Sequence, residues 1–355
     1  MIILKIKANN VYNFRDFTLD FSYPKKIINS TIGDEYLEGY PNFRFKKAVI
    51  LMGSSATGKT CLGRLISKIA LCVNSKNGDH LKDIAKDNAC VELCFLNGSP
   101  ILYKLVFKIT NGEFIIDLFE NKIGKKDSFE LAESGLKMTV SNDINAISKR
   151  IGFLECQFAY PEISNKLNIS DENKSDFLKV LKCVIGTLDP TLKDVVVSKE
   201  LDNSFIIKRK SDTVIIQDGI LLNKELLSSG TIEGIDVALF IASMITKKQS
   251  FYYCDEHFSY IHTDIEKRIF SIMVGKLKNN EQLIFTTHNA DMLDLNVPKH
   301  TFAFLKRNPD GSPFAVFADS LLKRNTDSVR SAVENDLFES TPDLSLLNEL
   351  EEDYE

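Results

Sequence analysis

Apolar and polar positions alternate with a period of two through much of the first 120 residues, which is the pattern of half-buried strands. We predict strands over Ile2–Lys7, Asn13–Phe21, Val91–Leu96, Ile101–Phe107 and Glu113–Phe119. The turn sequences Asn97-Gly98-Ser99-Pro100 and Asn111-Gly112 separate the last three, so we expect an antiparallel meander. The Pro, Gly and Asn residues of Tyr23–Phe45 predict a loop or a small insertion.

The later part of the chain changes to alternating helix and strand patterns. We predict helices over Asp171–Ile185 (begun by Asp171 or Ser170), Thr231–Thr246 and Thr263–Lys278, a hairpin pair within Ser204–Leu222, and strands over Phe251–Cys254, Gln282–Thr287, His300–Lys306 and Pro313–Phe317. Alternation of this kind predicts an α/β fold.

A glycine-rich octapeptide follows the buried strand Ala48–Met52 and precedes a stretch with helical periodicity, Cys61–Leu71. The phosphate-binding pattern G-x-x-x-x-G-K-[ST] is matched without deviation by Gly53, Ser54, Ser55, Ala56, Thr57, Gly58, Lys59 and Thr60. In such a loop, backbone N–H groups point at phosphates, Lys59 supplies a point charge, and Thr60 offers its hydroxyl to Mg²⁺. We therefore predict a nucleoside triphosphate site; the alternative is a plain turn before a helix.

Two adjacent acids end the buried strand of residues 251–254. Ligands of open α/β sheets bind at the carboxyl ends of strands, and neighbouring strand residues point to opposite sides. Asp255 is therefore predicted to hold Mg²⁺, directly or through water, and Glu256 to act as the base for an attacking water. His288 follows the next strand, where it can donate a hydrogen bond to the γ-phosphate. The alternative is a pair of solvated acids.

A small hydroxyl-bearing turn, Leu226–Thr231, opens a helix and forms a second candidate anion site. With this turn the chain resembles the ABC-type ATPases: Leu227-Ser228-Ser229-Gly230-Thr231 matches their signature, Asp255 and Glu256 their acidic pair, and His288 their switch histidine, in the family's order. Gln157 stands where the family has its Mg²⁺-sensing glutamine. Phe14 and Arg15 are candidate adenine contacts by resemblance, although Phe14 also reads as a core residue.

The resemblance implies a P-loop NTPase of ABC-ATPase type, with a mixed central sheet, an antiparallel β subdomain and a small helical lobe. It implies ATP and Mg²⁺ as cofactors, hydrolysis of ATP to ADP and phosphate, and a homodimer or larger assembly. In that assembly Ser228, Ser229 and Gly230 of one chain close on ATP held by the other. We divide the chain into residues 1–160 (first part of the ATPase domain), 161–226 (helix and hairpin insert), 227–320 (second part) and 321–355 (acidic tail).

Within that family, Val11–Phe17 is similar to the N-terminal strand of the SMC, RecF and OLD group. The signature, the acidic pair and Thr286-Thr287-His288-Asn289 look most like stand-alone AAA-family ATPases of bacterial anti-phage (abortive infection) systems. This predicts an ATPase that controls a separately encoded effector, a nuclease or toxin, because the sequence offers no second catalytic centre. The alternatives are a RecF/SMC-like repair clamp that binds DNA and, ranked last, an ATPase subunit of a transporter or assembly system.

Composition narrows the class further. The chain is 44% hydrophobic and 26% charged, and no apolar stretch approaches the roughly 20 residues of a membrane span. Seven scattered cysteines without a C-x-x-C pair fit a reducing compartment, so we expect a cytoplasmic protein. The net charge is −5, but Glu334–Glu355 contains nine carboxylates and no Lys or Arg. The rest of the chain therefore has a formal charge of −5 + 9 = +4. That surplus permits nucleic-acid contact without demanding it, and the acidic segment is read as a solvated helix rather than a docking segment.

Overall fold

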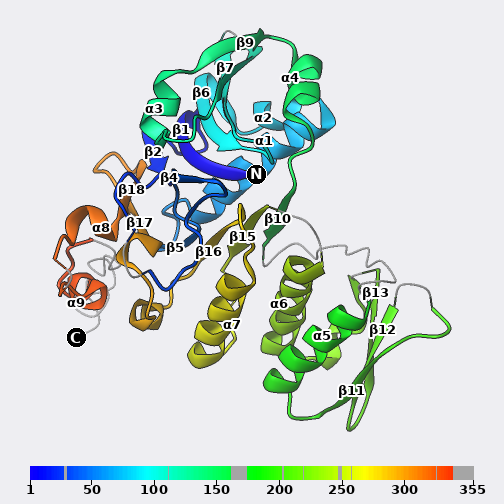
Figure 1. The fold of residues 1–355 in the computed structure, drawn as a ribbon. Coiled ribbons are helices and arrows are strands. Elements are labelled where there is room, and N and C mark those ends of the chain that lie inside the picture. Colours follow the sequence, from blue (N-terminus) through cyan, green and yellow to red (C-terminus); the bar gives the residue numbers. More distant parts are fainter. Residues whose placement is uncertain are drawn as a thin grey trace, which may run out of the picture.

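Helix α1 (Lys59–Ser75) lies between two six-stranded sheets. The computed structural model describes residues 1–27, 30–110, 112–160, 174–201, 204–218, 220–246, 250–256, 258–324 and 326–338 (Figure 1). The apolar face of α1 packs on both sheets, because Leu62, Leu65, Ile66 and Ile69 belong to a core shared with strands of each. The phosphate loop therefore enters a helix that is held on two sides.

The central sheet is mixed, as predicted. Its order is β10 (Cys156–Ala159), β15 (Phe251–Asp255), β16 (Gln282–Thr286), β5 (Ala48–Met52), β17 (Phe302–Arg307) and β18 (Pro313–Phe317). The first five strands are parallel, and β18 pairs antiparallel with β17. The carboxyl ends of β5, β15 and β16 therefore meet at one edge.

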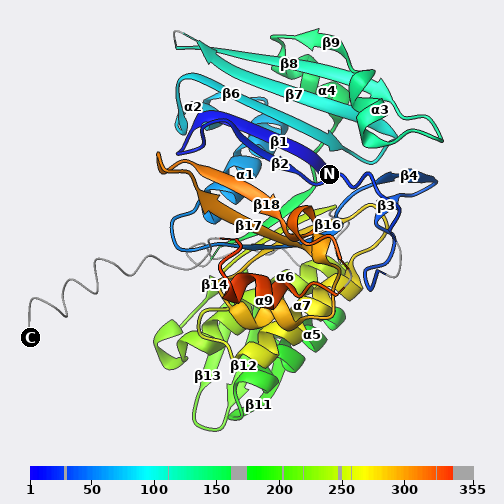
Figure 2. The same cartoon turned by 90° about the vertical axis from the view of Figure 1, so that its left-hand side faces the viewer.

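The predicted meander is confirmed and is part of a larger antiparallel sheet. The strand order is β2 (Phe17–Asp20), β1 (Ile2–Val11), β6 (Ala85–Leu96), β7 (Ile101–Thr110), β8 (Glu113–Lys122) and β9 (Lys137–Ser141). Short helices α2 (Asp79–Lys82), α3 (Phe129–Ser134) and α4 (Ile144–Ile151) accompany it (Figure 2). The strand predicted from Asn13 begins only at Phe17, because Tyr12 and Asp16 adopt positive φ in an intervening turn. The segment predicted as an insertion contains a small hairpin, β3 (Tyr36–Leu37) and β4 (Tyr40–Arg44).

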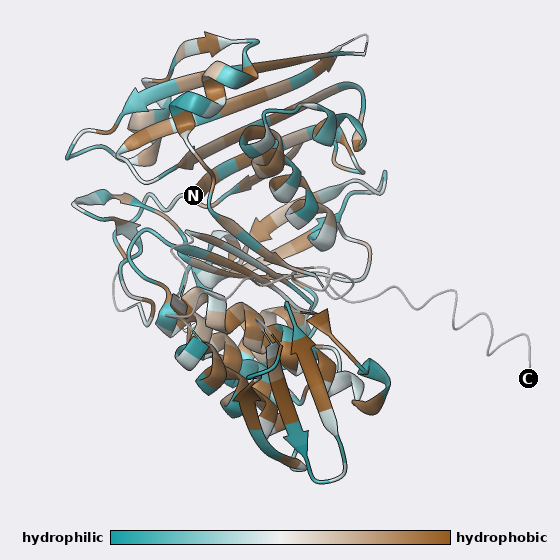
Figure 3. Cartoon of the chain, turned by 90° about the vertical axis from the view of Figure 1, so that its right-hand side faces the viewer, coloured by the Kyte–Doolittle hydropathy of each residue, from teal (hydrophilic) through white to brown (hydrophobic). Residues whose placement is uncertain are grey.

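A separate lobe contains the predicted helix and hairpins. It consists of α5 (Lys174–Leu188), the antiparallel strands β11 (Leu192–Val197), β12 (Ser204–Arg209), β13 (Thr213–Gln217) and β14 (Ile220–Leu221), the turn η2 (Lys224–Leu226), and α6 (Ser229–Thr246). Ser170 and Asp171, the predicted cap residues of α5, lie outside the described residues. One face of α6 packs in the lobe and another against the central sheet, so α6 is apolar around most of its circumference (Figure 3).

The remaining elements connect the strands of the central sheet or come after its last strand. They are α7 (Thr263–Lys276), η3 (Ala290–Asp294), η4 (Lys299–Thr301), α8 (Ala318–Leu321) and α9 (Val329–Glu334). Phe338 is buried and stacks on Phe304 of β17, with ring centroids 4.0 Å apart, so the start of the acidic segment packs on the body. The rest of that segment, 339–355, lies outside the described residues. Across the described ranges, no helix combines the length and apolarity needed to cross a bilayer.

Candidate nucleotide site

The backbone of the phosphate loop requires glycine at its two ends. Gly53 has φ +152° and Gly58 has φ +104°. A Cβ on Gly53 would lie 2.5 Å from the carbonyl oxygen of Leu305 on β17, so any side chain there would displace the neighbouring strand. Ala56 also has positive φ (+60°), and its carbonyl accepts a hydrogen bond of 2.7 Å from Arg307. The loop between β5 and α1 therefore lies close against β17, whose Arg307 side chain bonds it.

Lys59 is buried at the start of α1 and points back into the loop. Its Nζ donates to the carbonyl oxygens of Gly53 (2.7 Å) and Ser54 (3.1 Å) and lies 3.3 Å from Oε1 of Glu256. Burial lowers the pKa of the Lys59 ammonium, and the Glu256 carboxylate opposes that shift. The ammonium thus lies between the phosphate loop and an acid at the end of β15.

Asp255 is 1% exposed and joins two strands to α1. Its Oδ2 accepts a hydrogen bond of 2.7 Å from the hydroxyl of Thr60, and its Oδ1 accepts one of 2.8 Å from the hydroxyl of Thr286 on β16. Burial raises the pKa of this carboxyl, and the two hydroxyl donors limit the rise. A buried carboxylate without a direct ammonium or guanidinium partner is suited to a bound cation.

Glu256 lies just beyond the sheet edge in a left-handed backbone conformation, φ +46°. Its N–H donates to Thr286, and its Oε1 lies 2.8 Å from Nε2 of His288. Burial alone would raise the pKa of Glu256, but the His288 hydrogen bond and the Lys59 charge outweigh it and lower the pKa. Glu256 is therefore ionised at neutral pH, the form that accepts a proton, while its lowered pKa makes it a weaker base than an unperturbed glutamate.

Gln157 lies on β10, beside β15, with its neighbour across the strands at Tyr252. Its amide oxygen Oε1 is buried and has no hydrogen-bond partner. An unpaired buried carbonyl oxygen is costly, and oxygen is the donor that Mg²⁺ prefers. Gln157 is level with Tyr252, three residues before Asp255 along β15, and Tyr252 packs in the core on the side of the sheet opposite to α1. The structure therefore brings Thr60 and Asp255 together as candidate Mg²⁺ ligands and leaves Gln157 apart from them.

The signature residues lie elsewhere. Ser228 caps α6: its Oγ accepts from the N–H of Thr231 at 3.2 Å, so the helix begins at Ser229, two residues earlier than predicted. Gly230 abuts the segment after Glu256, where a Cβ would lie 2.7 Å from the Tyr260 carbonyl oxygen. In the described part of the chain, no hydrogen bond or ion pair joins Ser228, Ser229 or Gly230 to the phosphate loop.

Sequence reasoning assigned no role to Thr286, Tyr253 or Arg307, which hold Asp255, α1 and the phosphate loop respectively. Thr286 was within a matched motif, so its position before His288 was a usable signal; Arg307 carried none. The two candidate adenine contacts differ. Phe14 is buried in the core against Gly58, whereas Arg15 is exposed and pairs with Asp310 at 3.4 Å.

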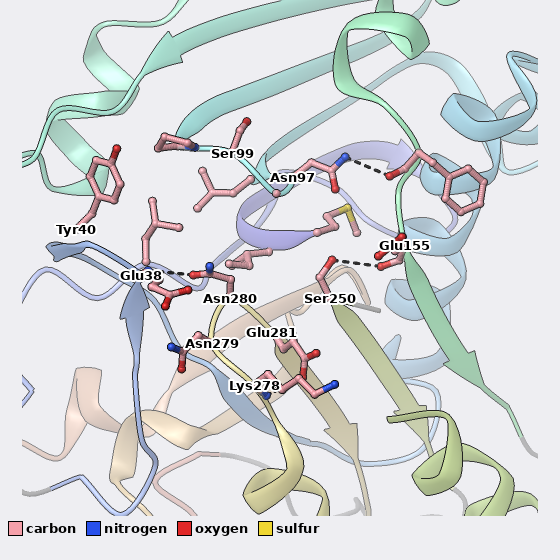
Figure 4. A pocket seen from close by; sticks show the side chains of 17 residues that line it. Glu38, Tyr40, Asn97, Ser99, Glu155, Ser250, Lys278, Asn279, Asn280 and Glu281 are labelled. Atoms are coloured by element: carbon pink, nitrogen blue, oxygen red, sulfur yellow. Dashed lines mark hydrogen bonds between the residues drawn. The ribbon is translucent and has the colours of Figure 1, made fainter. Parts of the chain in front are cut away.

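A cavity of about 690 Å³ opens at the opposite edge of the central sheet (Figure 4). Its lining includes Glu155, Ser250 and Glu281, which directly precede or lie at the start of β10, β15 and β16. The backbone N–H of Glu38 donates to the side chain of Asn280 at the same cavity. Its labelled side chains include three carboxylates and one lysine, a charge balance opposed to binding phosphates. We therefore place the nucleotide site by its chemical groups, at the carboxyl edge.

No protein-family model matches the chain, and no curated protein matches it. Among solved structures, an SMC head bound to the C-winged helix domain of ScpA superposes with a TM-score of 0.54 at 13% identity, covering 94% of this chain and 100% of that one. An SMC head from Thermotoga maritima (0.42, 17%, covering 89% and 99%) and one from Pyrococcus furiosus with an extended coiled coil, bound to the C-terminal domain of ScpA (0.49, 12%, covering 89% and 96%), are too distant to carry argument.

The first of these matches shows the fold. The chain has the fold of an SMC head, which is the ABC-type ATPase fold predicted from the order of its motifs. At 13% identity the match says nothing of activity, and the anti-phage branch of the prediction is not tested by it.

Proposed function

We propose that this protein binds ATP with Mg²⁺, hydrolyses it, and uses the cycle as a switch. The observation that supports this is the convergence of Lys59, Thr60, Asp255, Glu256 and His288, which come from three strand ends, at one edge of the central sheet. Such a convergence of one buried ammonium, one buried carboxylate and an acid–imidazole pair is the requirement of phosphoryl transfer to water.

Each residue has a defined task in this proposal. The N–H groups of the phosphate loop and the Lys59 ammonium bind the β- and γ-phosphates, with Lys59 exchanging its loop carbonyls for phosphate oxygens. Glu256 takes the proton of the attacking water, and His288, at 2.8 Å from it, orients the carboxylate. Thr60 and Asp255 would hold Mg²⁺, which neutralises charge that develops on the phosphates.

The exposed signature completes the proposal. Ser228 and Ser229 are exposed at the start of α6, and among the described residues no hydrogen bond or ion pair joins them to the phosphate loop of their own chain. A helix start of this kind is an anion site for the ATP of a second copy, so we propose that ATP closes two chains into a symmetric pair. Hydrolysis then releases the pair.

We propose further that this switch controls a separately encoded effector, a nuclease or toxin, in phage defence. This step rests on the motif resemblance. The SMC head that shares the fold is bound to a winged-helix domain of ScpA, so a partner chain on such a head has a precedent. The competing proposal is a clamp that binds DNA directly.

Two measurements test the proposal. Phosphate release with ATP and Mg²⁺ tests the enzyme, and absence of turnover by the wild-type protein and of any ATP binding would refute it. Glu256→Gln protein, isolated from its host with and without ATP, then tests the switch. A stoichiometric protein that co-purifies only with ATP supports effector control, whereas nuclease-sensitive DNA with salt-sensitive affinity supports the clamp.

A further inference from the structure

Glu266 is a buried carboxylate on α7 that the proposed chemistry does not use. Its side chain is 1% exposed, and α7 packs beside the segment that carries His288. Burying a carboxylate is expensive unless hydrogen bonds satisfy it. Both oxygens of Glu266 are satisfied, and both by the same three-residue segment.

The two contacts flank His288. Oε1 of Glu266 accepts a hydrogen bond of 2.7 Å from the hydroxyl of Thr287, and Oε2 accepts one of 2.6 Å from the amide of Asn289. Asn289 is fixed further, because its N–H donates to the Thr287 hydroxyl at 3.0 Å and its amide nitrogen donates to Thr263 at 3.1 Å. The backbone of the segment has contacts of its own, because the N–H of Thr287 donates to the carbonyl oxygen of Leu51 at 3.3 Å and Asn289 caps η3. The side chain of His288 is 41% exposed, so its position depends on this segment.

We propose that Glu266 is the positioning residue for His288. By accepting hydrogen bonds from Thr287 and Asn289, Glu266 keeps the imidazole 2.8 Å from Glu256. This inference rests on the proposed function, in which His288 orients Glu256. Without Glu266, the exposed His288 side chain would lose the two side-chain contacts that fix its neighbours, and a misplacement of about 1 Å at a catalytic group can cost on the order of 100-fold in rate.

The two hydrogen bonds of Glu266 with Thr287 and Asn289 define a conservative variant. Burial raises the pKa of Glu266, and the hydroxyl and amide that bind it are neutral. A glutamine at 266 has the same shape: its amide oxygen accepts from Asn289, and its amide nitrogen donates to the Thr287 hydroxyl, which can rotate to accept. Glu266→Gln therefore keeps both links, whereas Glu266→Ala removes both and Thr287→Val removes one while keeping its volume.

Kinetics and a double variant form the first arm of the test. We expect Glu266→Ala to lower kcat about 10-fold or more with the KM for ATP changed less than about 2-fold, and Glu266→Gln to restore turnover. The matched control is Met273→Ala, a fully buried apolar residue seven positions further along the same helix. Adding Glu266→Ala to His288→Ala should cause no further loss; multiplied losses, or a Glu266→Ala effect no larger than that of Met273→Ala, would overturn the proposal.

The second arm does not depend on turnover. Only five histidines are present, so the ring resonance of His288 can be identified in histidine-labelled protein by its loss in His288→Ala. We expect Glu266→Ala and Thr287→Val to move this resonance toward its position in Glu256→Ala, with Glu266→Gln and Met273→Ala leaving it in place. An unmoved resonance refutes the positioning role of Glu266. A moved resonance in a protein without ATP turnover refutes the proposed function, but the positioning of His288 by Glu266 still holds.

Discussion

The hydroxyl of Tyr253 donates a hydrogen bond of 2.6 Å to the carbonyl oxygen of Lys59. This bond joins the middle of β15 to the first turn of α1, beneath the phosphate loop. Tyr253 is fully buried, so its hydroxyl would be costly without this acceptor. The strand that ends in Asp255 and Glu256 is thereby fixed to the helix that carries Lys59 and Thr60.

The Tyr253 bond depends on a glycine one turn along α1. A Cβ on Gly63 would lie 2.5 Å from the Tyr253 ring, so Gly63→Ala must displace the ring. We expect a loss of about 1–3 kcal/mol in the free energy of unfolding, as for overpacked cores. The control is Gly275→Ala in α7, where the added methyl group meets nothing and helix propensity favours alanine by about 0.5–1 kcal/mol. Urea denaturation measures both, and equal changes would contradict the packing argument.

The Lys59 ammonium is the charge that the proposed site offers to phosphates. We expect Lys59→Ala to weaken ATP binding at least ~100-fold, since it removes a charge-assisted contact from a buried position. Its fold should persist, because within the described part of the chain Nζ bonds the loop carbonyls of Gly53 and Ser54 and the Glu256 carboxylate, and no more distant element. Lys68→Ala, on the same helix with its side chain 29% exposed, is the control and should bind ATP as the wild type does. Equilibrium titration with a fluorescent ATP analogue checks this.

Glu256→Gln separates binding from chemistry. We expect it to bind ATP with near wild-type affinity, to turn over at least ~100-fold more slowly, and to accumulate as an ATP-bound dimer. Turnover assays and sedimentation with and without ATP test these outcomes. Wild-type turnover in this variant would remove Glu256 from the role of base.

The pH dependence of Glu256 follows from its lowered pKa. A carboxyl whose folded pKa is depressed stabilises the fold above its ordinary value of 4.5, and that contribution disappears as the pH falls through the lowered value. The stability difference between wild type and Glu256→Gln should therefore be constant at neutral pH and shrink below roughly pH 4.5. A difference that changes between pH 6 and 8 would indicate another titrating group.

How much of this site could be predicted from the sequence depends on whether the residues concerned are adjacent in the chain or far apart in it. Lys59, Thr60, Asp255 and Glu256 belong to motifs of adjacent residues at strand ends, so local pattern and sheet topology placed them correctly at one edge. Most predicted strands are present for the same reason. The prediction was wrong at Asn13–Asp16, where residues with positive φ broke a pattern that looked continuous, and at His300 and Thr301, which belong to η4. The strands β9, β10 and β11 were not predicted.

The remaining contacts join residues far apart in the chain. Glu266 and Thr287, or Arg307 and Ala56, are brought together by how α7 packs and by the neighbour order of β5 and β17. A single sequence contains the residues but no pairing information, so these partners required the structure. The role of Ser228 as the N-cap of α6 could have been predicted from the sequence. Serine is a favoured N-cap residue, and the predicted helix start differed from the observed one by two residues.

Asp255 connects the proposed function to stability with a sign opposite to that of Glu256. Its folded pKa is raised above the ordinary value of 3.8, chiefly by burial, so the stability cost builds up as the pH rises from 3.8 to the raised value and is complete above it. At neutral pH the ligand-free protein therefore carries a buried negative charge that lowers its stability. A bound cation would remove that cost.

Asp255→Asn tests this argument. Asparagine has the same size, accepts from one threonine hydroxyl and donates to the other, so the contacts with Thr60 and Thr286 can be kept without the charge. We expect the ligand-free variant to melt at a higher temperature than the wild type at pH 7–8, with the difference narrowing as the pH falls. We also expect ATP with Mg²⁺ to raise the melting temperature of the wild type but not of the variant. An equal rise in both proteins would exclude Asp255 from the metal site, and a less stable ligand-free variant would mean that the two hydroxyl donors outweigh the cost of burial.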